Sequence, residues 1–215
     1  MIEEKNIDYK LHHWGPCLMG TKCPDNVVSY LLDAKNKIDE DARSTLAGHI
    51  EKELFFKQEH KRFFIEHTKH IFSKYINVLT KEWNPMAKMQ FDTMELDKFW
   101  INTMKAGEFN PMHTHSGQIS FVIFIKVDPE INEEHKTTIC NHSGPGVLEF
   151  HYGQYMKNEI GLIHRYEMFP EVGDMYIFPA YLHHMVVPFK SKNAERISCS
   201  GNIFLKSDMM VKDEI

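Results

Sequence analysis

The chain has 215 residues, of which 42% are hydrophobic and 26% are charged. This composition is ordinary for a globular protein and excludes disorder, collagen-like repetition and coiled coil as descriptions of the whole chain. The net charge of −5 argues against a nucleic-acid partner, because such proteins usually carry a basic excess. The length fits one domain over residues 1–215, and no apolar run approaches the roughly 18 residues of a membrane span.

The cysteine content and the N-terminus indicate a cytoplasmic protein. The chain has four cysteines, and none of them forms a C-x-x-C pair, so reduced thiols are expected. The first ten residues, MIEEKNIDYK, contain neither a basic segment nor an apolar one, so no signal peptide is expected.

The first part of the chain, residues 1–88, is predicted to be mainly helical and to support the rest. Apolar residues recur near helical spacing in three segments, 24–38, 42–56 and 60–83. His60, His67 and His70 share spacings of three and seven in the third segment, which makes a metal site on that helix conceivable. No carboxylate or cysteine completes such a site, so solvated or core-edge histidines are the simpler interpretation.

From about residue 89 the pattern changes to short strands. Residues 119–127, ISFVIFIKV, form a nearly continuous apolar run, which is typical of a strand buried on both faces. Gly and Pro punctuate the remaining segments, and many short strands with such turns favour a β-sandwich or jelly roll. We therefore expect an α+β fold, in which a jelly-roll core over residues 89–215 carries the N-terminal helices on its outside. The other expected strands are 91–103, 146–151, 174–179, 184–189 and 196–205.

Histidine is frequent, at 14 residues, and two places in the strand-rich part could present it to a metal. His113 and His115 are two residues apart, and on a strand they would point to the same side. His183 and His184 are adjacent, so one can face the interior while the other is exposed. Each place alone is equally compatible with structural or solvated histidines.

The last expected strand has a polar side that suits an anion. Arg196, Ser198 and Ser200 alternate with Ile197 and Cys199, so one side gathers a guanidinium and two hydroxyls. A buried arginine needs an anion, and a carboxylate is its natural bidentate partner. An internal Asp or Glu would satisfy it as well as a ligand would.

These features, in this order, resemble the Fe(II)/2-oxoglutarate-dependent oxygenase superfamily, whose site lies inside a double-stranded β-helix, a form of jelly roll. The resemblance is greater to one branch, the prolyl-hydroxylase-like 2OG-Fe(II) oxygenases of phages and bacteria, and covers about residues 98–205. That branch has W-x-N, G-x-x-N-x-x-H-x-H, a Ser-led apolar strand, G-D-x-x-x-F-P, H-x-V-x-P and E-R-I-S before an Asn. The matching residues are Trp100-Ile-Asn102, Gly107-Glu-Phe-Asn110, His113-Thr-His115, Ser120, Gly173-Asp174, Phe178-Pro179, His184-Met-Val186-Val-Pro188, Glu195-Arg196-Ile-Ser198 and Asn202.

The resemblance implies roles for individual residues. His113 and His184 match the two metal histidines of the family. Arg196 matches the arginine that pairs with the distal carboxylate of 2-oxoglutarate, and Ser198 matches the hydroxyl that touches the same carboxylate. Two asparagines would either touch the cosubstrate or hold turns: Asn102 and Asn110.

His115 is a departure from the family, because most members have Asp or Glu at that position. A 2-His-1-carboxylate triad marks non-haem Fe(II) oxygenases, and three imidazoles would leave the metal one negative charge short of it. Three interpretations stay open: a three-His site, a carboxylate from elsewhere (Glu149 or Asp174), or a His115 that contacts the metal ligands but not the metal. We favour His115 as a ligand, because alternation along a strand would put it on the side of His113.

The implied activity is that of a dioxygenase with Fe(II) as cofactor and 2-oxoglutarate and O2 as cosubstrates. Such an enzyme hydroxylates a C–H bond and releases succinate and CO2. The family-level expectation for the prime substrate is a peptidyl side chain such as proline, with a small molecule or a nucleobase as alternatives. The enzyme would act in the cytoplasm, or in that of the host if a phage encodes it. Two other classes remain: a cupin-like metalloenzyme that does not use 2-oxoglutarate, and a non-catalytic jelly-roll binding module.

Overall fold

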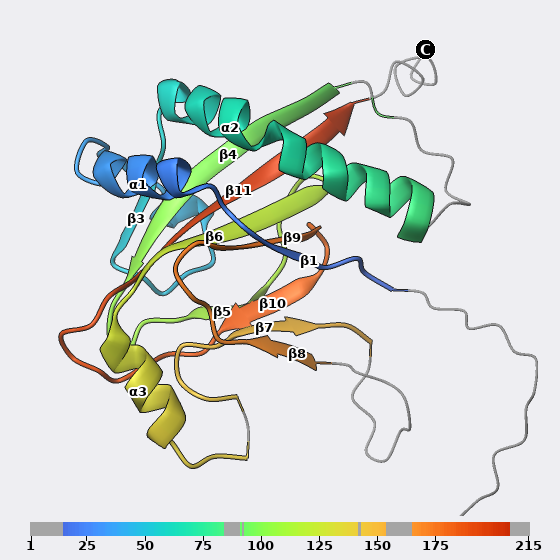
Figure 1. Cartoon of the computed structure of the whole chain (residues 1–215). Helices are drawn as coiled ribbons and strands as arrows, with labels where there is room; N and C mark the ends of the chain where they lie inside the picture. Colours follow the sequence, from blue (N-terminus) through green and yellow to red (C-terminus); the bar gives the residue numbers. More distant parts are fainter. Residues whose placement is uncertain (1–14, 84–90, 92, 142, 154–164, 207–215) are drawn as a thin grey trace, which may run out of the picture.

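Two antiparallel sheets face each other, and two helices cover the outer face of the larger sheet (Figure 1). The structure is a computed structural model that describes residues 15–83, 91, 93–141, 143–153 and 165–206. Its elements in chain order are β1 (Met19–Lys22), α1 (Asp25–Ala34), β2 (Glu40–Asp41), the 3-10 turn η1 (Arg43–Thr45), β3 (Lys52–Phe55), α2 (Gln58–Asn77), the π-helical turn η2 (Val78–Trp83), β4 (Thr93–Met104), β5 (Asn110–His113), β6 (Ile119–Val127), α3 (Pro129–Thr137), β7 (Leu148–His151), β8 (Arg165–Met168), β9 (Asp174–Pro179), β10 (His183–Val186) and β11 (Arg196–Lys206).

The order of the strands matches the predicted jelly roll. The larger sheet runs β1-β9-β6-β11-β4-β3-β2, and the smaller sheet runs β5-β10-β7-β8. From β4 onward the chain passes back and forth between the two sheets, and two sheets packed face to face enclose a core between them. The strand β11 lies in the middle of the larger sheet, bonded to β4 on one side and to β6 on the other.

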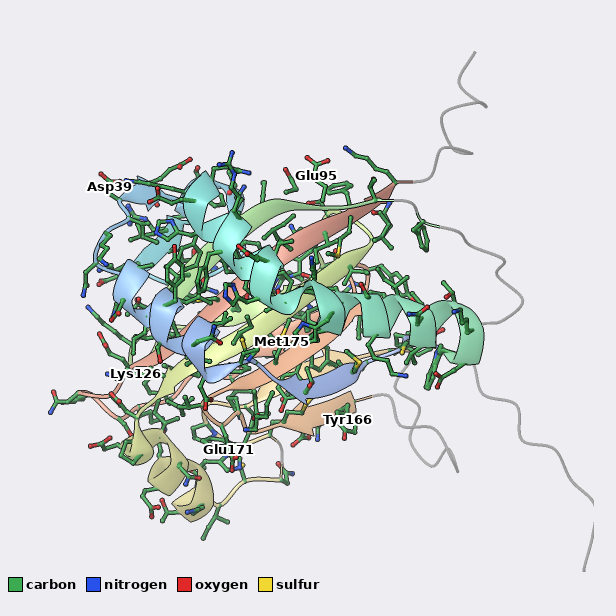
Figure 2. All side chains as sticks on the ribbon, turned by 45° about the horizontal axis from the view of Figure 1, so that its top comes forward. Asp39, Glu95, Lys126, Tyr166, Glu171 and Met175 are labelled. Carbon is green, nitrogen blue, oxygen red and sulfur yellow. The ribbon has the colours of Figure 1, made fainter. Side chains whose placement is uncertain are left out.

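A mainly apolar layer fills the space between the helices and the larger sheet. Phe64 and Phe72 of α2 contact Phe121 of β6, and Phe64 also stacks on Phe99 of β4. All four rings are fully buried. Figure 2 shows the helices lying across this sheet, with Met175 of β9 beneath them. A second apolar cluster, which includes Phe124, Leu148, Phe150 and Phe178, lies between the two sheets.

The predicted helix over residues 42–56 is wrong. This segment forms η1 and then β3, which pairs with β4 from Lys52 opposite Thr103 to Phe55 opposite Trp100. The apolar spacing of Leu46, Ile50 and Leu54 resembles that of a helix, but β4 offers an open edge whose backbone groups need partners. Edge pairing with residues about fifty positions away therefore decides the structure of this segment, as tertiary context often does.

The other predicted elements agree with the structure more closely. The helix over 24–38 is α1, and the helix over 60–83 is α2 followed by η2. The strands 119–127 and 174–179 are found at the predicted bounds as β6 and β9, whereas α3, β1 and β8 were not predicted. No helix in the described part of the chain is both long and apolar enough to cross a membrane.

The histidines of α2 lie at the edge of the apolar layer. His60 is 4% exposed, and its ring packs near those of Tyr30 and Phe56. His67 stacks on Phe63 of its own helix. Within the described residues, the group of three possible metal donors does not include these histidines.

Candidate active site

A cavity of about 320 Å³ lies between the two sheets, where the inner faces of β4 and β11 meet β5 and β10. Successive side chains of a strand point to opposite faces, so alternate residues of β4 and β11 reach this space. Its polar lining includes every site residue that the sequence suggested: Asn102, Asn110, His113, His115, His184, Arg196 and Ser198.

Three histidines converge on one point of the cavity wall. His113 ends β5 and faces His184 of β10 in the register of the two strands. His115 follows two residues after the strand, where its backbone N–H donates to the carbonyl of Ala180 at 2.9 Å. One nitrogen from each ring lies within 4.8 Å of the others, and the Nε2 atoms of His115 and His184 are 3.0 Å apart. Strand alternation therefore does not orient His115, since the strand has already ended.

The rings are held in the form that a metal requires. Nδ1 of His113 lies 2.7 Å from the carbonyl oxygen of Pro111, and Nδ1 of His184 lies 2.9 Å from that of Leu182. A carbonyl only accepts, so both Nδ1 atoms carry the proton and each Nε2 has a free lone pair. Burial lowers the pKa of all three rings, to about 2 for His115 and about 3 for His184, so they are neutral at physiological pH.

Neither carboxylate considered as an alternative joins this group. Glu149 is buried on β7, but it lies 2.8 Å from Nε2 of His151. Asp174 is the first residue of β9, and its carboxylate forms an ion pair with Lys22 of β1 at 2.6 Å. The group of possible metal donors among the described residues consists of His113, His115 and His184 alone.

Arg196, the first residue of β11, is 3% exposed. Its Nη1 donates to the carbonyl of Gly146 at 2.7 Å, and its guanidinium lies 5.4 Å from the ring centre of Phe124. Its Nε has no hydrogen-bond partner among the residues described. Burial lowers its pKa to about 9, which leaves it protonated at neutral pH. No carboxylate within the described residues pairs with it, so the cavity holds a positive charge that lacks an anion.

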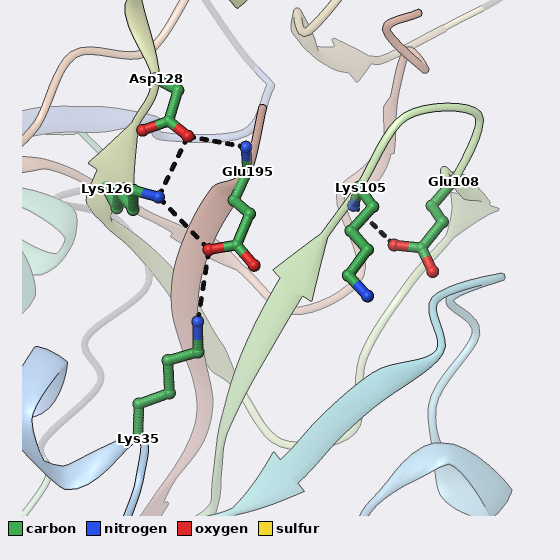
Figure 3. Close-up of polar contacts among 6 residues, drawn as sticks. All are labelled: Lys35, Lys105, Glu108, Lys126, Asp128 and Glu195. Atoms are coloured by element: carbon green, nitrogen blue, oxygen red, sulfur yellow. Dashed lines mark hydrogen bonds and ion pairs between the residues drawn. The ribbon is translucent and has the colours of Figure 1, made fainter. Parts of the chain in front are cut away.

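The neighbouring Glu195 does not supply that anion (Figure 3). Its carboxylate binds Lys126 at 3.3 Å and Lys35 at 3.5 Å, and its N–H donates to Asp128 at 2.9 Å. These contacts fix the start of β11 against β6 and hold the carboxylate on the other side of the strand from Arg196.

The remaining predicted residues take distinct places. Ser198 and Asn102 face each other across β11 and β4, and both are buried. In the part of the chain that the structure describes, the Oδ1 atom of Asn102 has no partner. Asn110 begins β5 and is half-buried. His183 is exposed while His184 is 6% exposed, as their adjacency predicted.

One cavity residue was missed by the sequence reasoning. Glu53 of β3 is 1% exposed and lines the same space as the histidines. It lay within the segment that was predicted to be helical, where a glutamate is an ordinary surface residue, and no motif included it.

The strand-rich part of the chain resembles a known protein family. The sequence profile of the family described as "Putative 2OG-Fe(II) oxygenase" matches residues 98–202, which is just under half of the chain. The matched segment contains the three convergent histidines and Arg196, and the family is named for Fe(II) and 2-oxoglutarate. No curated protein sequence matches the chain.

Solved structures share the fold of this protein at low sequence identity. A viral collagen prolyl hydroxylase from Paramecium bursaria Chlorella virus 1, solved with 2OG, is 13% identical, with a TM-score of 0.52 over 86% of this chain and 94% of that one. A Pseudomonas putida prolyl-4-hydroxylase is 11% identical, with a TM-score of 0.52 over 90% and 94%. A 2OG-Fe(II) oxygenase family oxidoreductase from Burkholderia pseudomallei is 11% identical, with a TM-score of 0.55 over 88% and 84%. These likenesses show the jelly-roll fold.

The chemistry of the cavity fits the two groups that the family uses. Imidazole nitrogens are ordinary ligands for iron, and the three rings are neutral and aimed at one point. A dicarboxylate such as 2-oxoglutarate would supply the anion that Arg196 lacks. The donor set differs from the usual triad of two histidines and a carboxylate only in its third member.

Proposed function

We propose that this protein is an oxygenase that hydroxylates a C–H bond of a prime substrate and couples that step to the conversion of 2-oxoglutarate into succinate and CO2. The observation that carries the proposal is the pairing, in one cavity, of three neutral, convergent histidines with a buried arginine that has no anion. A metal site alone would leave Arg196 without a role.

The proposal gives each residue a task. His113, His115 and His184 would hold the iron, and Arg196 and Ser198 would bind the distal carboxylate of 2-oxoglutarate. The iron, when bound, supplies the activation of O2 that hydroxylation needs. The protein would orient the cosubstrate and exclude water, for which the apolar lining by Phe124, Leu148 and Phe178 is suited.

A peptidyl side chain is the substrate class that we propose, since two of the structural relatives are prolyl hydroxylases. A third relative, a prolyl hydroxylase from Trichoplax adhaerens with a TM-score of 0.51 and 11% identity, was solved with a peptide fragment. The cavity of about 320 Å³ is lined by residues of β3 and β5 as well as by the histidines, and a space of this size suits one side chain beside a bound cosubstrate rather than a folded partner.

An anaerobic visible-absorption titration tests this function. Fe(II) and then 2-oxoglutarate are added to the metal-free protein, and a weak charge-transfer band is expected only when both are present. Arg196→Met should bind iron normally but require at least about tenfold more 2-oxoglutarate for half the band, because a charged hydrogen-bond partner is lost. Arg62→Met removes the same charge from the exposed face of α2 and should behave as wild type.

Each other outcome contradicts the proposal in a different way. Iron binding without the band would favour a cupin-like enzyme that does not use 2-oxoglutarate. No iron binding would favour a non-catalytic jelly roll. An unchanged 2-oxoglutarate affinity in Arg196→Met would remove Arg196 from the cosubstrate site.

A further inference from the structure

The cavity contains a second charged group that the proposed chemistry does not use. Glu53 lies on β3 and is 1% exposed, and its Oε2 atom has no hydrogen-bond partner within the described residues. A buried carboxylate oxygen without a partner is costly, because it loses its hydration and gains no compensating contact.

The sheet places Glu53 at a fixed distance from the cosubstrate end. Glu53 faces Asn102 in the register of β3 and β4, and Asn102 faces Ser198 in the register of β4 and β11. These three residues form one row across the sheet. Neighbouring strands are about 4.8 Å apart, so Glu53 lies roughly 10 Å from Ser198, at the side of the cavity away from Arg196.

Oxygen acceptors surround the carboxylate. A Cβ atom added to Gly48 would lie 2.4 Å from Oε1 of Glu53 and 2.8 Å from Oδ1 of Asn110, so both oxygens reach the same point beside this glycine. Asn102 faces Glu53 in the register of β3 and β4, and its buried Oδ1 atom has no partner among the described residues. A group with several donors would satisfy these oxygens together, as an ammonium or a guanidinium does.

The charges around Glu53 also favour a cation. Burial, together with Glu108 and Asp41, raises the pKa of Glu53 to about 7, and only Arg43 opposes them. Arg43 is already bound to Asp41 at 2.6 Å.

Glu108 is held in place by backbone groups. It accepts the N–H of Lys105 at 2.6 Å and that of Glu51 at 2.8 Å, so it lies between the β4–β5 turn and the residues before β3 (Figure 3 shows the first bond).

The positive groups of the cavity do not neutralise Glu53. Arg196 and Lys98 both line the cavity, but neither bonds to Glu53 and neither is among the charges that act on it. The cavity thus has a cation without an anion at one end and a carboxylate without a cation at the other.

We propose that Glu53, with Asn102 and Asn110, binds a cationic nitrogen of the prime substrate. The hydroxylated group is then a basic side chain, or an amine of similar length, in preference to a prolyl ring. This inference rests on the proposed function, because the other end of the cavity is assigned to 2-oxoglutarate.

Matched probes test the inference directly. Anaerobic calorimetry is carried out on the protein loaded with Fe(II) and 2-oxoglutarate. The probes are N-acetyl-lysine amide with its neutral counterpart N-acetyl-norleucine amide, and N-acetyl-arginine amide with N-acetyl-citrulline amide. In the wild type, at least one cationic probe should bind about 10- to 100-fold more tightly than its neutral counterpart, as expected for a hydrogen-bonded charge pair.

The variants identify the residue responsible. Glu53→Gln keeps the shape of the side chain and should abolish the preference for the cation, whereas Glu53→Asp keeps the charge and should retain part of it. Glu51→Gln removes an exposed charge two residues away and should keep the full preference. A pH series on the wild type is a further test. Its preference for the cationic probe over the neutral one should weaken as the pH falls from 8 to 6, because Glu53 becomes protonated.

Two results would overturn the inference: no preference for either cationic probe in the wild type, or a preference that survives in Glu53→Gln. The absorption band of the same samples separates this failure from that of the proposed function. A band without a preference refutes the substrate assignment alone, and a missing band refutes the oxygenase site itself.

Discussion

The two faces of β11 carry opposite chemistry. Ile197, Cys199 and Ile203 belong to the apolar layer beneath the helices, while Arg196 and Ser198, one residue away from them, line the cavity. The same alternation continues across β4, where Phe99 and Ile101 face the helices and Asn102 faces the cavity. One set of strands therefore supplies stability on its outer face and binding on its inner face.

The two faces also differ in how well their groups are satisfied. The outer face is filled mainly by stacked aromatic rings and aliphatic side chains, and its buried polar atoms without a partner among the described residues, Nδ1 of His60 and Oγ1 of Thr103, belong to neutral groups. On the inner face, buried atoms of Glu53, Asn102 and Arg196 lack partners. Each such atom costs about 1–3 kcal/mol, so the inner face is stabilised less in the free protein than its burial suggests. The substitutions below should therefore separate folding from binding.

We expect the largest effect to be a loss of activity when a residue of the inner face is substituted. His184→Ala removes a proposed iron ligand. Mutation of a residue that only hydrogen-bonds to a metal ligand already lowers metal affinity or activity about 10- to 100-fold, so turnover of 2-oxoglutarate in His184→Ala should fall by more than about 100-fold. His183→Ala alters the exposed neighbour on the same strand and should stay close to wild type. Succinate release measured on both variants checks this, and undiminished turnover in His184→Ala would contradict the ligand assignment.

We expect the next largest effect to be a loss of stability when a residue of the outer face is substituted. Phe64 is fully buried against Phe99 and Phe121, so Phe64→Ala should lower the free energy of unfolding by about 3–5 kcal/mol. Urea unfolding measures this loss. At a temperature where the variant is folded, the affinity for 2-oxoglutarate should be unchanged, and a loss of iron binding by the folded variant would show that the two faces are not independent.

The smallest effect concerns the pH dependence of stability at Glu53. Its pKa is about 7 in the folded state against 4.5 for an ordinary glutamate, so the folded state keeps a proton that the unfolded chain releases between these values. Wild-type stability should fall as the pH rises from about 4.5 to about 7, and should level off above that. Glu53→Gln lacks this proton, so it should gain up to about 3 kcal/mol over wild type across the same interval.

Unfolding curves at several pH values for both proteins measure the difference. Glu51→Gln is the control, because its exposed carboxylate should give a curve parallel to that of the wild type. Parallel curves for Glu53→Gln and the wild type would mean that Glu53 is not buried as an unpaired carboxyl.

The parts of the fold that could be predicted from sequence are those with local signals. The apolar run of β6 and the Gly-Asp start of β9 gave their bounds, because a strand buried on both faces needs such residues wherever it lies. The convergence of His113, His115 and His184 followed from a family pattern rather than from strand geometry, since His115 lies beyond the end of β5.

The parts that could not be predicted depend on distant partners. The segment before β3 has helical spacing, and only the free edge of β4 makes it a strand. The burial of Glu53 is a consequence of that pairing, so a residue that looks like surface in the sequence is a cavity residue in the structure. The lack of a carboxylate partner for Arg196 among the described residues could not be predicted either, because an internal Asp or Glu could have paired with it.

The docking of β3 on β4 has a consequence for how selectivity can change in this lineage. The strand lies outside residues 98–202, which match the oxygenase family and contain the three histidines and Arg196. In the proposed substrate site, Glu53 comes from outside the matched segment, whereas Asn102 and Asn110 come from inside it. Exchange of residues 45–53 between relatives is therefore expected to change the preference for a cationic substrate while it leaves the proposed iron and 2-oxoglutarate residues in place.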